Sequence, residues 1–435
     1  MQKSKFAVLL VVCLMVLGLS TVVHAQNEVT LTAWSADHLY LQYFESRLPD
    51  FQALHPDVTI KFEGVDDSSA PANALNAIAA NPDNPGLPDM LGMERAQFGN
   101  YMKNGIIAKY FLDLSDLVEA DKADYSAGRM AIYTYEGKLY ALESQLAASL
   151  LYYQPDVFTA AGVDVPTTWE QVINDVGPKL AAKGSAFTFA TNDGDWFLMF
   201  FDQRGGFVFD ADGNFVMGDD TNKPLAIEVA TALQKGVQNG TFMVVLGGDV
   251  WSGATIPTAY TSGKLAGTVM PDWWATCCLE PDAGPEMSGK WKVALPPTWE
   301  GGGHSTLTWG GTGWAVSSAS PNAELAKEFL AFAYLGLESQ VSKFQQINNF
   351  PWYIPAFSDP RVSDLEDPYF SNQHLGEFYG KVAADVPVWY NSPFFPSVKS
   401  AFADNLPGLF DGTLTPEQFV DNSIKTTQDA IDFGF

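Results

Sequence analysis

The chain has 435 residues, of which 51 are acidic and 24 basic, and its formal net charge at pH 7 is −27. Nucleic acids and anionic membrane surfaces attract basic proteins, so this charge argues against both as partners. A single hydrophobic core stops growing at about 250–300 residues, and we therefore expect the chain to fold as two lobes.

Residues 1–25 have the pattern of a secretory signal peptide. Two lysines precede an apolar run over residues 6–19, and a small-residue cleavage site ends at Ala25. The alternative is an uncleaved anchor, because residues 6–23 are just long enough to span a bilayer. Cys13 lies inside the apolar run and lacks the small preceding residue of a lipoprotein site. We expect an exported protein that is periplasmic, extracellular or associated with the cell surface.

The remaining chain opens with a strand, a helix and a second strand, which is the pattern of an α/β protein. Buried strands and amphipathic helices then alternate to the C-terminus. The predicted strands cover residues 29–34, 58–62, 87–91, 292–296 and 312–316, and the predicted helices cover residues 39–55, 73–80, 97–104, 168–183, 195–203, 223–238 and 323–335.

Five short motifs occur in an order that resembles a known family. They are GKLYAL at 137–142, LYY at 151–153, AGV at 161–163, PTTWE at 166–170 and SPNAELAKEFL at 320–330. This order resembles the extracellular solute-binding proteins of ABC importers, and most closely their sugar-binding, maltose-binding-protein-like group. The resemblance covers nearly all of the chain after the signal segment.

The resemblance implies an α/β, two-lobed periplasmic-binding-protein fold with the ligand cleft between the lobes. The N-terminal lobe would contain residues 26–145 and 303–338, and the C-terminal lobe residues 146–302 and 339–435, with hinge crossovers near Gln145, Gly302 and Gly336. Such a protein is a monomer that catalyses nothing and needs no cofactor or metal. It closes around a mono- or oligosaccharide and delivers it to the transmembrane subunits of a permease.

Two loops after predicted strands of the N-terminal lobe supply candidate ligand contacts, because α/β sheets bind ligands at the carboxyl ends of their strands. The first loop contains Trp34, Asp37 and His38. Asp37 is equally suited to cap the helix that follows it. The second loop contains Glu94 and Gln97. Maltose-binding proteins have an aspartate–arginine pair here, at the positions of residues 96 and 97, and this difference argues against maltodextrin specificity.

Aromatic side chains of the C-terminal lobe are the second group of candidates, because sugar rings stack on flat apolar faces. Core packing is the competing interpretation for each of them. The family places a stacking aromatic near residue 196 and another at the end of the strand before residue 273, which makes Trp273 the strongest single candidate. The candidates in the C-terminal lobe are Asp195, Trp196, Trp273, Trp274 and Phe395. Trp309 and Gly310, just beyond the second crossover, are added because Trp309 could form a wall and a glycine lets backbone N–H groups approach a ligand closely.

Cys277 and Cys278 are adjacent and follow the tryptophan pair. They are either two reduced, buried thiols or a vicinal disulfide, which lies outside ordinary bridge geometry. A disulfide would place a rigid apolar plate beside Trp273, and we include both cysteines among the substrate-binding candidates.

Three other functions compete with sugar capture. A secreted glycosidase also needs aromatic subsites and paired carboxylates, but no nucleophile elbow, zinc motif or phosphate loop occurs. A binding protein for glycerol phosphate or another anion needs converging cations, which Arg95 and Arg204 could supply. A structural surface module predicts internal repeats, and the sequence has none. The histidines are scattered, which argues against a metal site.

Overall fold

A five-stranded mixed sheet forms the centre of the first lobe. The computed structural model describes residues 27–434, so the predicted signal peptide lies outside the described residues. The strand order is β2 (Val58–Asp66), β1 (Asn27–Ser35), β3 (Met90–Glu94), β12 (Thr312–Val316) and β6 (Leu142–Glu143). β1 is parallel to β2 and β3, whereas β12 is antiparallel to both β3 and β6. Leu31 and Ala33 alternate along β1 and are fully buried.

Helices from the N-terminal third of the chain and from residues 323–347 cover this sheet. Tyr43 of α1 donates a hydrogen bond to the carbonyl oxygens of Ala333 and Ser339, so α1 packs against both α16 and α17. The predicted lobe boundary at residue 338 falls inside α17. The helices of this lobe are α1 (His38–Leu54), α2 (Ala70–Ala80), α3 (Arg95–Met102), α4 (Ile106–Tyr110), α5 (Ser115–Val118), α6 (Ala127–Ile132), α16 (Ala323–Tyr334) and α17 (Gly336–Ile347).

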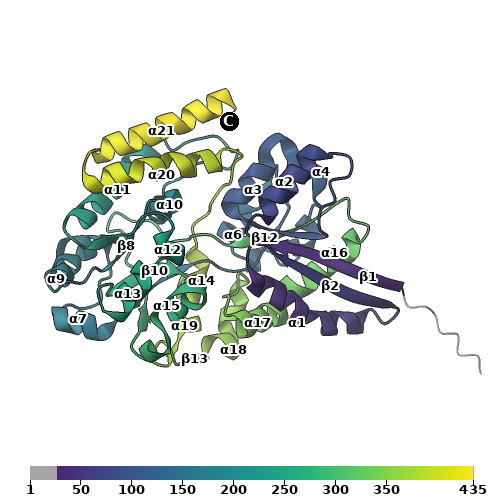
Figure 1. Cartoon of the computed structure of the whole chain (residues 1–435), viewed down its shortest axis with the longest axis horizontal. Helices are drawn as coiled ribbons and strands as arrows, with labels where there is room; N and C mark the ends of the chain where they lie inside the picture. Colours follow the sequence, from purple (N-terminus) through teal and green to yellow (C-terminus); the bar gives the residue numbers. More distant parts are fainter. Residues whose placement is uncertain (1–26, 435) are drawn as a thin grey trace, which may run out of the picture.

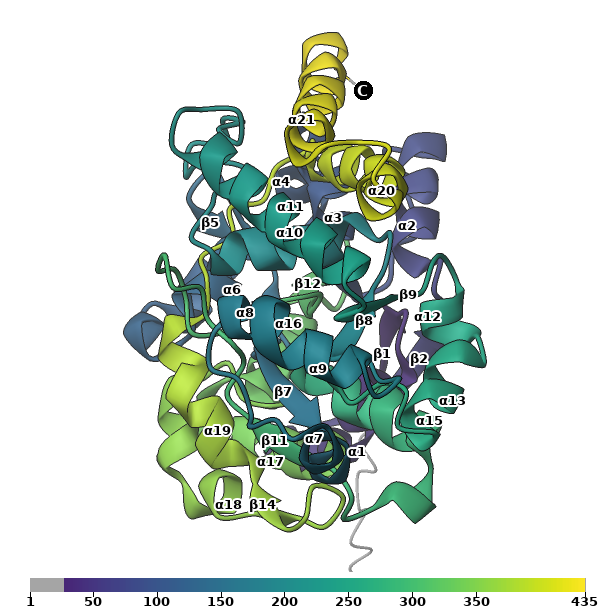
Figure 2. The same ribbon diagram turned by 90° about the vertical axis from the view of Figure 1, so that its left-hand side faces the viewer.

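The second lobe is built on a three-stranded antiparallel sheet. Its central strand β7 (Ser149–Tyr153) is flanked by β10 (Gly267–Pro271) and β11 (Lys292–Ala294). The first four residues of β7 are buried, as expected for a strand covered on both faces. Figure 2 looks onto this lobe, with α9, α10 and α11 in front and β1 and β2 behind. A parallel pair, β8 (Thr188–Ala190) and β9 (Phe242–Val244), completes its strands.

The other helices and short strands surround these sheets (Figure 1). The short hairpin strands are β4 (Thr134–Tyr135), β5 (Lys138–Leu139), β13 (Glu366–Asp367) and β14 (Gln373–His374). The helices are α7 (Pro155–Ala161), α8 (Trp169–Gln171), α9 (Gly177–Ala181), α10 (Gly194–Gln203), α11 (Asn222–Gln238), α12 (Asp249–Ser252), α13 (Thr255–Thr261), α14 (Asp272–Trp274), α15 (Glu280–Ala283), α18 (Pro360–Ser363), α19 (Leu375–Val382), α20 (Phe395–Asp411) and α21 (Pro416–Phe433).

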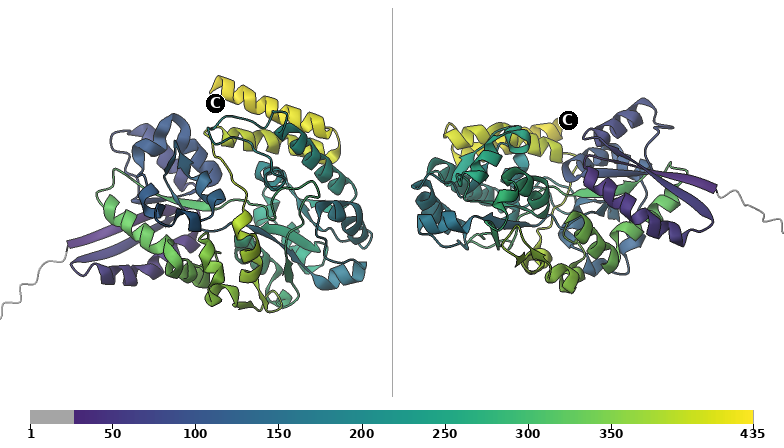
Figure 3. Two further views of the ribbon diagram at one scale, coloured as in Figure 1. Left: turned by 180° about the vertical axis from the view of Figure 1, so that it is seen from behind. Right: turned by 60° about the horizontal axis from the view of Figure 1, so that its bottom comes forward.

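Extended segments connect the two lobes (Figure 3). Residues 144–148 lead from β6 to β7, and residues 295–311 lead back from β11 to β12. These two segments touch through an antiparallel bridge between Ala148 and Thr308. A further segment, residues 386–394, runs between α19 and α20. The junction between the lobes is therefore made of non-helical chain from several places in the sequence.

Most predicted elements occur where the sequence placed them, but the strand predicted at residues 87–91 begins later, at Met90. Pro88 explains the shift, because proline has no N–H to donate to a strand ladder. Within residues 27–434, no helix is both long and apolar enough to cross a membrane.

Candidate functional site

A cavity of about 670 Å³ lies between the lobes, and we call it the inner compartment. The first lobe contributes the ends of β1 and β3 and the starts of α1 and α3. The second lobe contributes α12, α14 and the start of α10, and the connecting segments contribute Gln145, Trp309 and Gly310. The volume is within the range of about 300–1,000 Å³ that is usual for small-molecule sites. A ligand here would touch both lobes at once.

Acidic side chains from two helix starts line the first-lobe wall. Asp37 precedes α1 and accepts a hydrogen bond from the Leu39 N–H at 2.8 Å, so it is both a helix cap and a cavity residue. Burial raises the pKa of Asp37. Glu94 and Gln97 form a capping box at the start of α3. Their caps hold both side chains in place at the cavity wall.

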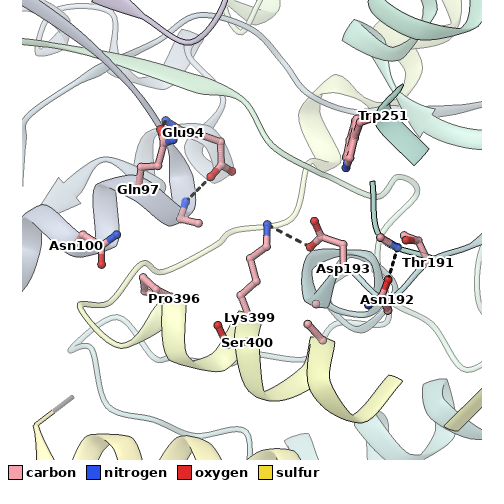
Figure 4. Close-up of a pocket in the computed structure, with 14 residues that line it drawn as sticks. Glu94, Gln97, Asn100, Thr191, Asn192, Asp193, Trp251, Pro396, Lys399 and Ser400 are labelled. Carbon is pink, nitrogen blue, oxygen red and sulfur yellow. Dashed lines mark hydrogen bonds and ion pairs between the residues drawn. The ribbon is translucent and has the colours of Figure 1, made fainter. Parts of the chain in front are cut away.

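A buried ion-pair network joins the lobes beside this wall. Arg95 of α3 is fully buried and donates a 2.7 Å bond to Asp195 of α10, which also binds the Lys399 Nζ at 2.8 Å. Figure 4 shows Lys399 reaching from α20 toward Asp193, with Glu94 across the gap. Burial alone would raise the pKa of Asp195, but the charges of Arg95 and Lys399 outweigh it and lower this pKa to about 2.

The same network perturbs the two neighbouring groups. Burial and the charge of Asp195 raise the pKa of Glu94. Burial lowers the pKa of Lys399, but the carboxylates of Asp195, Glu94 and Asp193 outweigh it and raise this pKa overall. Both cations of the network are thus balanced by carboxylates, and no unpaired cation faces the inner compartment in the part of the chain that the structure describes.

Trp251, Trp273 and Trp309 line the opposite wall, with Trp274 buried behind them. Trp273 donates its Nε1–H to the Trp309 carbonyl oxygen at 2.9 Å and lies nearly parallel to Trp251, with ring centroids 6.2 Å apart. Trp251 is 52% exposed, whereas Trp274 is fully buried behind it and donates to the Tyr260 hydroxyl. The second lobe therefore presents the rings of Trp251 and Trp273 to the cavity.

Cys277 and Cys278 are joined by a disulfide, which decides between the two predicted states. Cys277 is exposed and lines the inner compartment, and Cys278 is partly buried against the core. The preceding Thr276 also lines the compartment and accepts a hydrogen bond from Asn348. The disulfide therefore presents an apolar sulfur edge on the same side as the tryptophans.

The connecting segments form the back of the compartment. Arg129 binds the Glu143 carboxylate at 2.6 Å and donates to the Gly310 carbonyl oxygen at 2.7 Å. A side chain at Gly311, whose φ is 97°, would clash with the Arg129 guanidinium. Gln145 is 2% exposed, and its Oε1 has no hydrogen-bond partner among residues 27–434. A buried acceptor without a partner is suited to a ligand hydroxyl.

A family model settles the class of the protein. The model of the bacterial extracellular solute-binding proteins matches residues 36–335. The chain belongs to this family. The sequence resemblance is thereby confirmed, and all five motifs that carried it lie within the matched range.

Individual relatives of this solute-binding protein span nearly the whole chain. An arabinooligosaccharide-binding protein of Bacillus subtilis (strain 168) is 27% identical, with 91% of each chain covered. A lactose-binding protein of Rhizobium radiobacter is 24% identical, with 93% of this chain and 92% of that protein covered.

Solved structures confirm the predicted two-lobed fold. A member of extracellular solute-binding protein family 1 superimposes with a TM-score of 0.76 at 20% identity, covering 92% of this chain and 99% of that one. The ABC transporter associated binding protein of B. animalis subsp. lactis Bl-04, in complex with β-1,6-galactobiose, gives a TM-score of 0.72 at 22% identity and covers 94% and 98% of the two chains.

In this solute-binding protein, eight of the predicted site residues line the inner compartment and six do not. The residues that line the inner compartment are Asp37, Glu94, Gln97, Asp195, Trp273, Cys277, Trp309 and Gly310. The residues that do not are Trp34, His38, Trp196, Trp274, Cys278 and Phe395.

Packing explains the second group. Trp196 is 1% exposed against Phe200, Phe242 and Phe410. Trp274 is fully buried, with its ring against those of Phe189 and Trp251. Phe395 is buried against the ring of Trp389 and the Arg95 guanidinium. Trp34 packs partly against the core within β1, and His38 is on the solvent side of α1 with 62% of its side chain exposed. The structure thus places these five positions away from the inner compartment.

Sequence reasoning missed several polar residues of the compartment and undervalued one aromatic residue. Trp251 was recognisable only as a tryptophan in a Gly-rich loop, and Gln145 was considered only as part of a crossover. The missed polar residues that line the compartment are Tyr40, Ser68, Asp193, Thr276, Thr312, Asn349 and Lys399. Among the described residues, no group of three or more histidine, cysteine or acidic side chains is arranged to hold a metal ion.

Asp202 gives this solute-binding protein a pH-dependent stability. Asp202 is 3% exposed, and burial raises its pKa to about 7. Between about pH 4 and 7 the folded protein keeps a proton that the unfolded chain releases, so the free energy of unfolding falls as pH rises, by up to about 1.4 kcal/mol per pH unit. Asp202→Asn cannot ionise and is expected to flatten this slope.

Urea unfolding of both proteins between pH 4 and 8 measures the effect. Burial also raises the pKa of Asp272 to about 7, so Asp272 makes the free energy of unfolding fall with pH in both proteins. Burial lowers the pKa of Lys343 to about 7, so Lys343 makes the free energy of unfolding rise with pH above pH 7, again in both proteins. The difference between the two curves therefore isolates Asp202. Parallel curves would show that Asp202 is ionised in the fold.

Proposed function

We propose that this protein captures a mono- or oligosaccharide outside the cytoplasm and delivers it to the permease of an ABC importer. The observation that carries the proposal is the pairing of two unlike walls in one cavity. Trp251 and Trp273 present aromatic faces on the second lobe, and Asp37, Glu94 and Gln145 present hydrogen-bond acceptors from the first lobe and the crossover. A pyranose needs an apolar plate for its C–H face and acceptors for its hydroxyl groups.

The charge of the cavity supports a neutral ligand over the anionic alternative. Lys399 is held by Asp193 and Asp195, and Arg95 is fully buried behind the wall. Arg204, the second cation considered for an anion site, pairs with Glu228 and does not line the compartment. An anionic solute would instead face the carboxylates of Asp37 and Glu94. The sugar ligands in the names of the relatives point in the same direction.

The mechanism we propose is capture by closure of the lobes. A ligand that touches both walls binds the closed arrangement more tightly than the open one and so favours closure. The predicted lobes, residues 26–145 with 303–338 and residues 146–302 with 339–435, would move about the connecting segments as a monomer. The exported protein would then present the sugar to the permease, with the Cys277–Cys278 disulfide as a rigid part of the sugar contact.

A thermal-shift panel tests this function. The protein without its first 25 residues is mixed with arabinose, galactose, lactose, maltose and their oligosaccharides, with glycerol 3-phosphate and amino acids as contrasts. A sugar at a hundred-fold excess over its Kd should stabilise the fold by about 2.7 kcal/mol, which raises Tm by a few degrees. A shift with glycerol 3-phosphate alone would transfer the assignment to an anion, and cleavage of a bound glycan would show an enzyme.

A further inference from the structure

A second cavity of about 560 Å³ continues from the inner compartment, and we call it the outer compartment. It lies between the start of α3, the start of α10 and the exposed side of α20. The two compartments share five lining residues, which are Glu94, Gln97, Asp193, Trp251 and Lys399. Each compartment alone has the volume of an ordinary small-molecule site, so one small sugar fills only one of them.

The outer compartment offers polar groups that have no role in the fold. Asn100 of α3 and Ser400 of α20 line it, and neither side chain makes a hydrogen bond within residues 27–434. In Figure 4 these two side chains lie on opposite sides of the gap, with the short side chain of Pro396 between them. An amide and a hydroxyl can each donate and accept, which suits the mixed hydrogen bonding of a polyol.

Lys399 and Trp251 lie where the two compartments meet, and both can contact a ligand that occupies both compartments. The Lys399 ammonium has three N–H groups, and its bonds to Asp193 and Asp195 leave one for a ligand oxygen. Trp251 is half exposed and borders both compartments, so its ring is available to a sugar on either side.

We infer that the ligand is an oligosaccharide of about three or more units, which occupies both compartments and passes the junction at Lys399 and Trp251. The inference rests on the proposed function and narrows its ligand class. The sugar at one end lies against Trp273 and the disulfide, and the further units extend toward Asn100 and Ser400. A monosaccharide or disaccharide forms only part of these contacts.

Calorimetric titration with chain-length series tests the inference. Mono- through pentasaccharides of the arabinose, galactose and maltose series are titrated into the full exported chain, into Ser400→Trp and into Asp404→Trp. Ser400→Trp fills the outer compartment from an exposed helix position, and Asp404 is an exposed residue one turn further along α20 that lines neither compartment.

In the unmodified protein, we expect a trisaccharide or longer sugar to bind at least about 10-fold more tightly than the monosaccharide of the same series. Ser400→Trp should remove this gain and leave the affinity for the shortest bound sugar unchanged, whereas Asp404→Trp should leave both unchanged. Full affinity for a mono- or disaccharide, or an unchanged length dependence in Ser400→Trp, overturns the inference but leaves sugar capture standing. Absence of binding by every series overturns both.

Discussion

Replacing Asp195 with alanine is expected to lower the free energy of unfolding by about 3–5 kcal/mol. Asp195 is fully buried and holds Arg95 of the first lobe and Lys399 of the second lobe at 2.7 and 2.8 Å. Without it, the Arg95 guanidinium remains buried with its main partner gone, and the nearest remaining carboxylate oxygen, on Glu94, is 4.0 Å away. Urea unfolding of the two proteins at pH 7 measures the difference.

The control removes both partners. In the double variant Arg95→Met, Asp195→Leu no charge is left buried without a partner, and apolar side chains suit the neighbouring rings of Trp389 and Phe395. Its stability should exceed that of Asp195→Ala, because the desolvation cost of the ions is removed together with their attraction. A loss below about 1 kcal/mol in Asp195→Ala would mean that water reaches and solvates Arg95.

Replacing Trp273 with alanine is expected to weaken sugar binding by about 10–100-fold, with a smaller effect on folding. The Trp273 ring lines the inner compartment, is only partly buried, and is positioned by its 2.9 Å hydrogen bond to the Trp309 carbonyl oxygen. The variant removes a stacking face from the cleft and leaves Trp251 without its parallel neighbour. The measurement is calorimetric titration with the best sugar from the panel, together with the Tm of the unliganded variant.

Trp291→Phe is the matched control for Trp273→Ala. Trp291 is fully buried beside Tyr260, lines neither compartment, and has no hydrogen bond from its Nε1 to the described residues. We expect it to lower Tm and to leave the sugar affinity unchanged. If Trp273→Ala behaves in the same way, then Trp273 is a core residue and the aromatic wall does not bind the ligand.

Local sequence patterns predicted the elements well. The alternation of Leu31 and Ala33 marks β1, and the helical period of the next segment marks α1, because both signals depend on residues a few positions apart. The position of Asp37 between this strand and this helix was also informative. A short polar residue at a helix start caps the helix, as Asp37 does, and a residue that follows a strand of an α/β sheet lies at the ligand-binding edge of that sheet.

Local sequence patterns did not predict which side chains point into the cavity and which point into the core. Trp273 and Trp274 are neighbours with the same chemistry, yet the first lines the cleft and the second is fully buried. Successive residues of a helix point about 100° apart, so the rotation of α14 against its neighbours decides which ring faces the cavity. Trp196 is a second such case, because every residue of α10 is buried and only Asp195 of its first turn, not Trp196, lines the inner compartment.

The family, the two-lobed α/β fold and the adjacency of Cys277 and Cys278 could be predicted without coordinates, because they follow from motif order and from neighbouring positions. The packing of the folded chain was needed to show which tryptophans face the cleft and that Arg95 pairs with Asp195. Those two residues are 100 positions apart and belong to different lobes. Such a contact depends on how whole helices pack across the junction, which no local pattern of residues encodes.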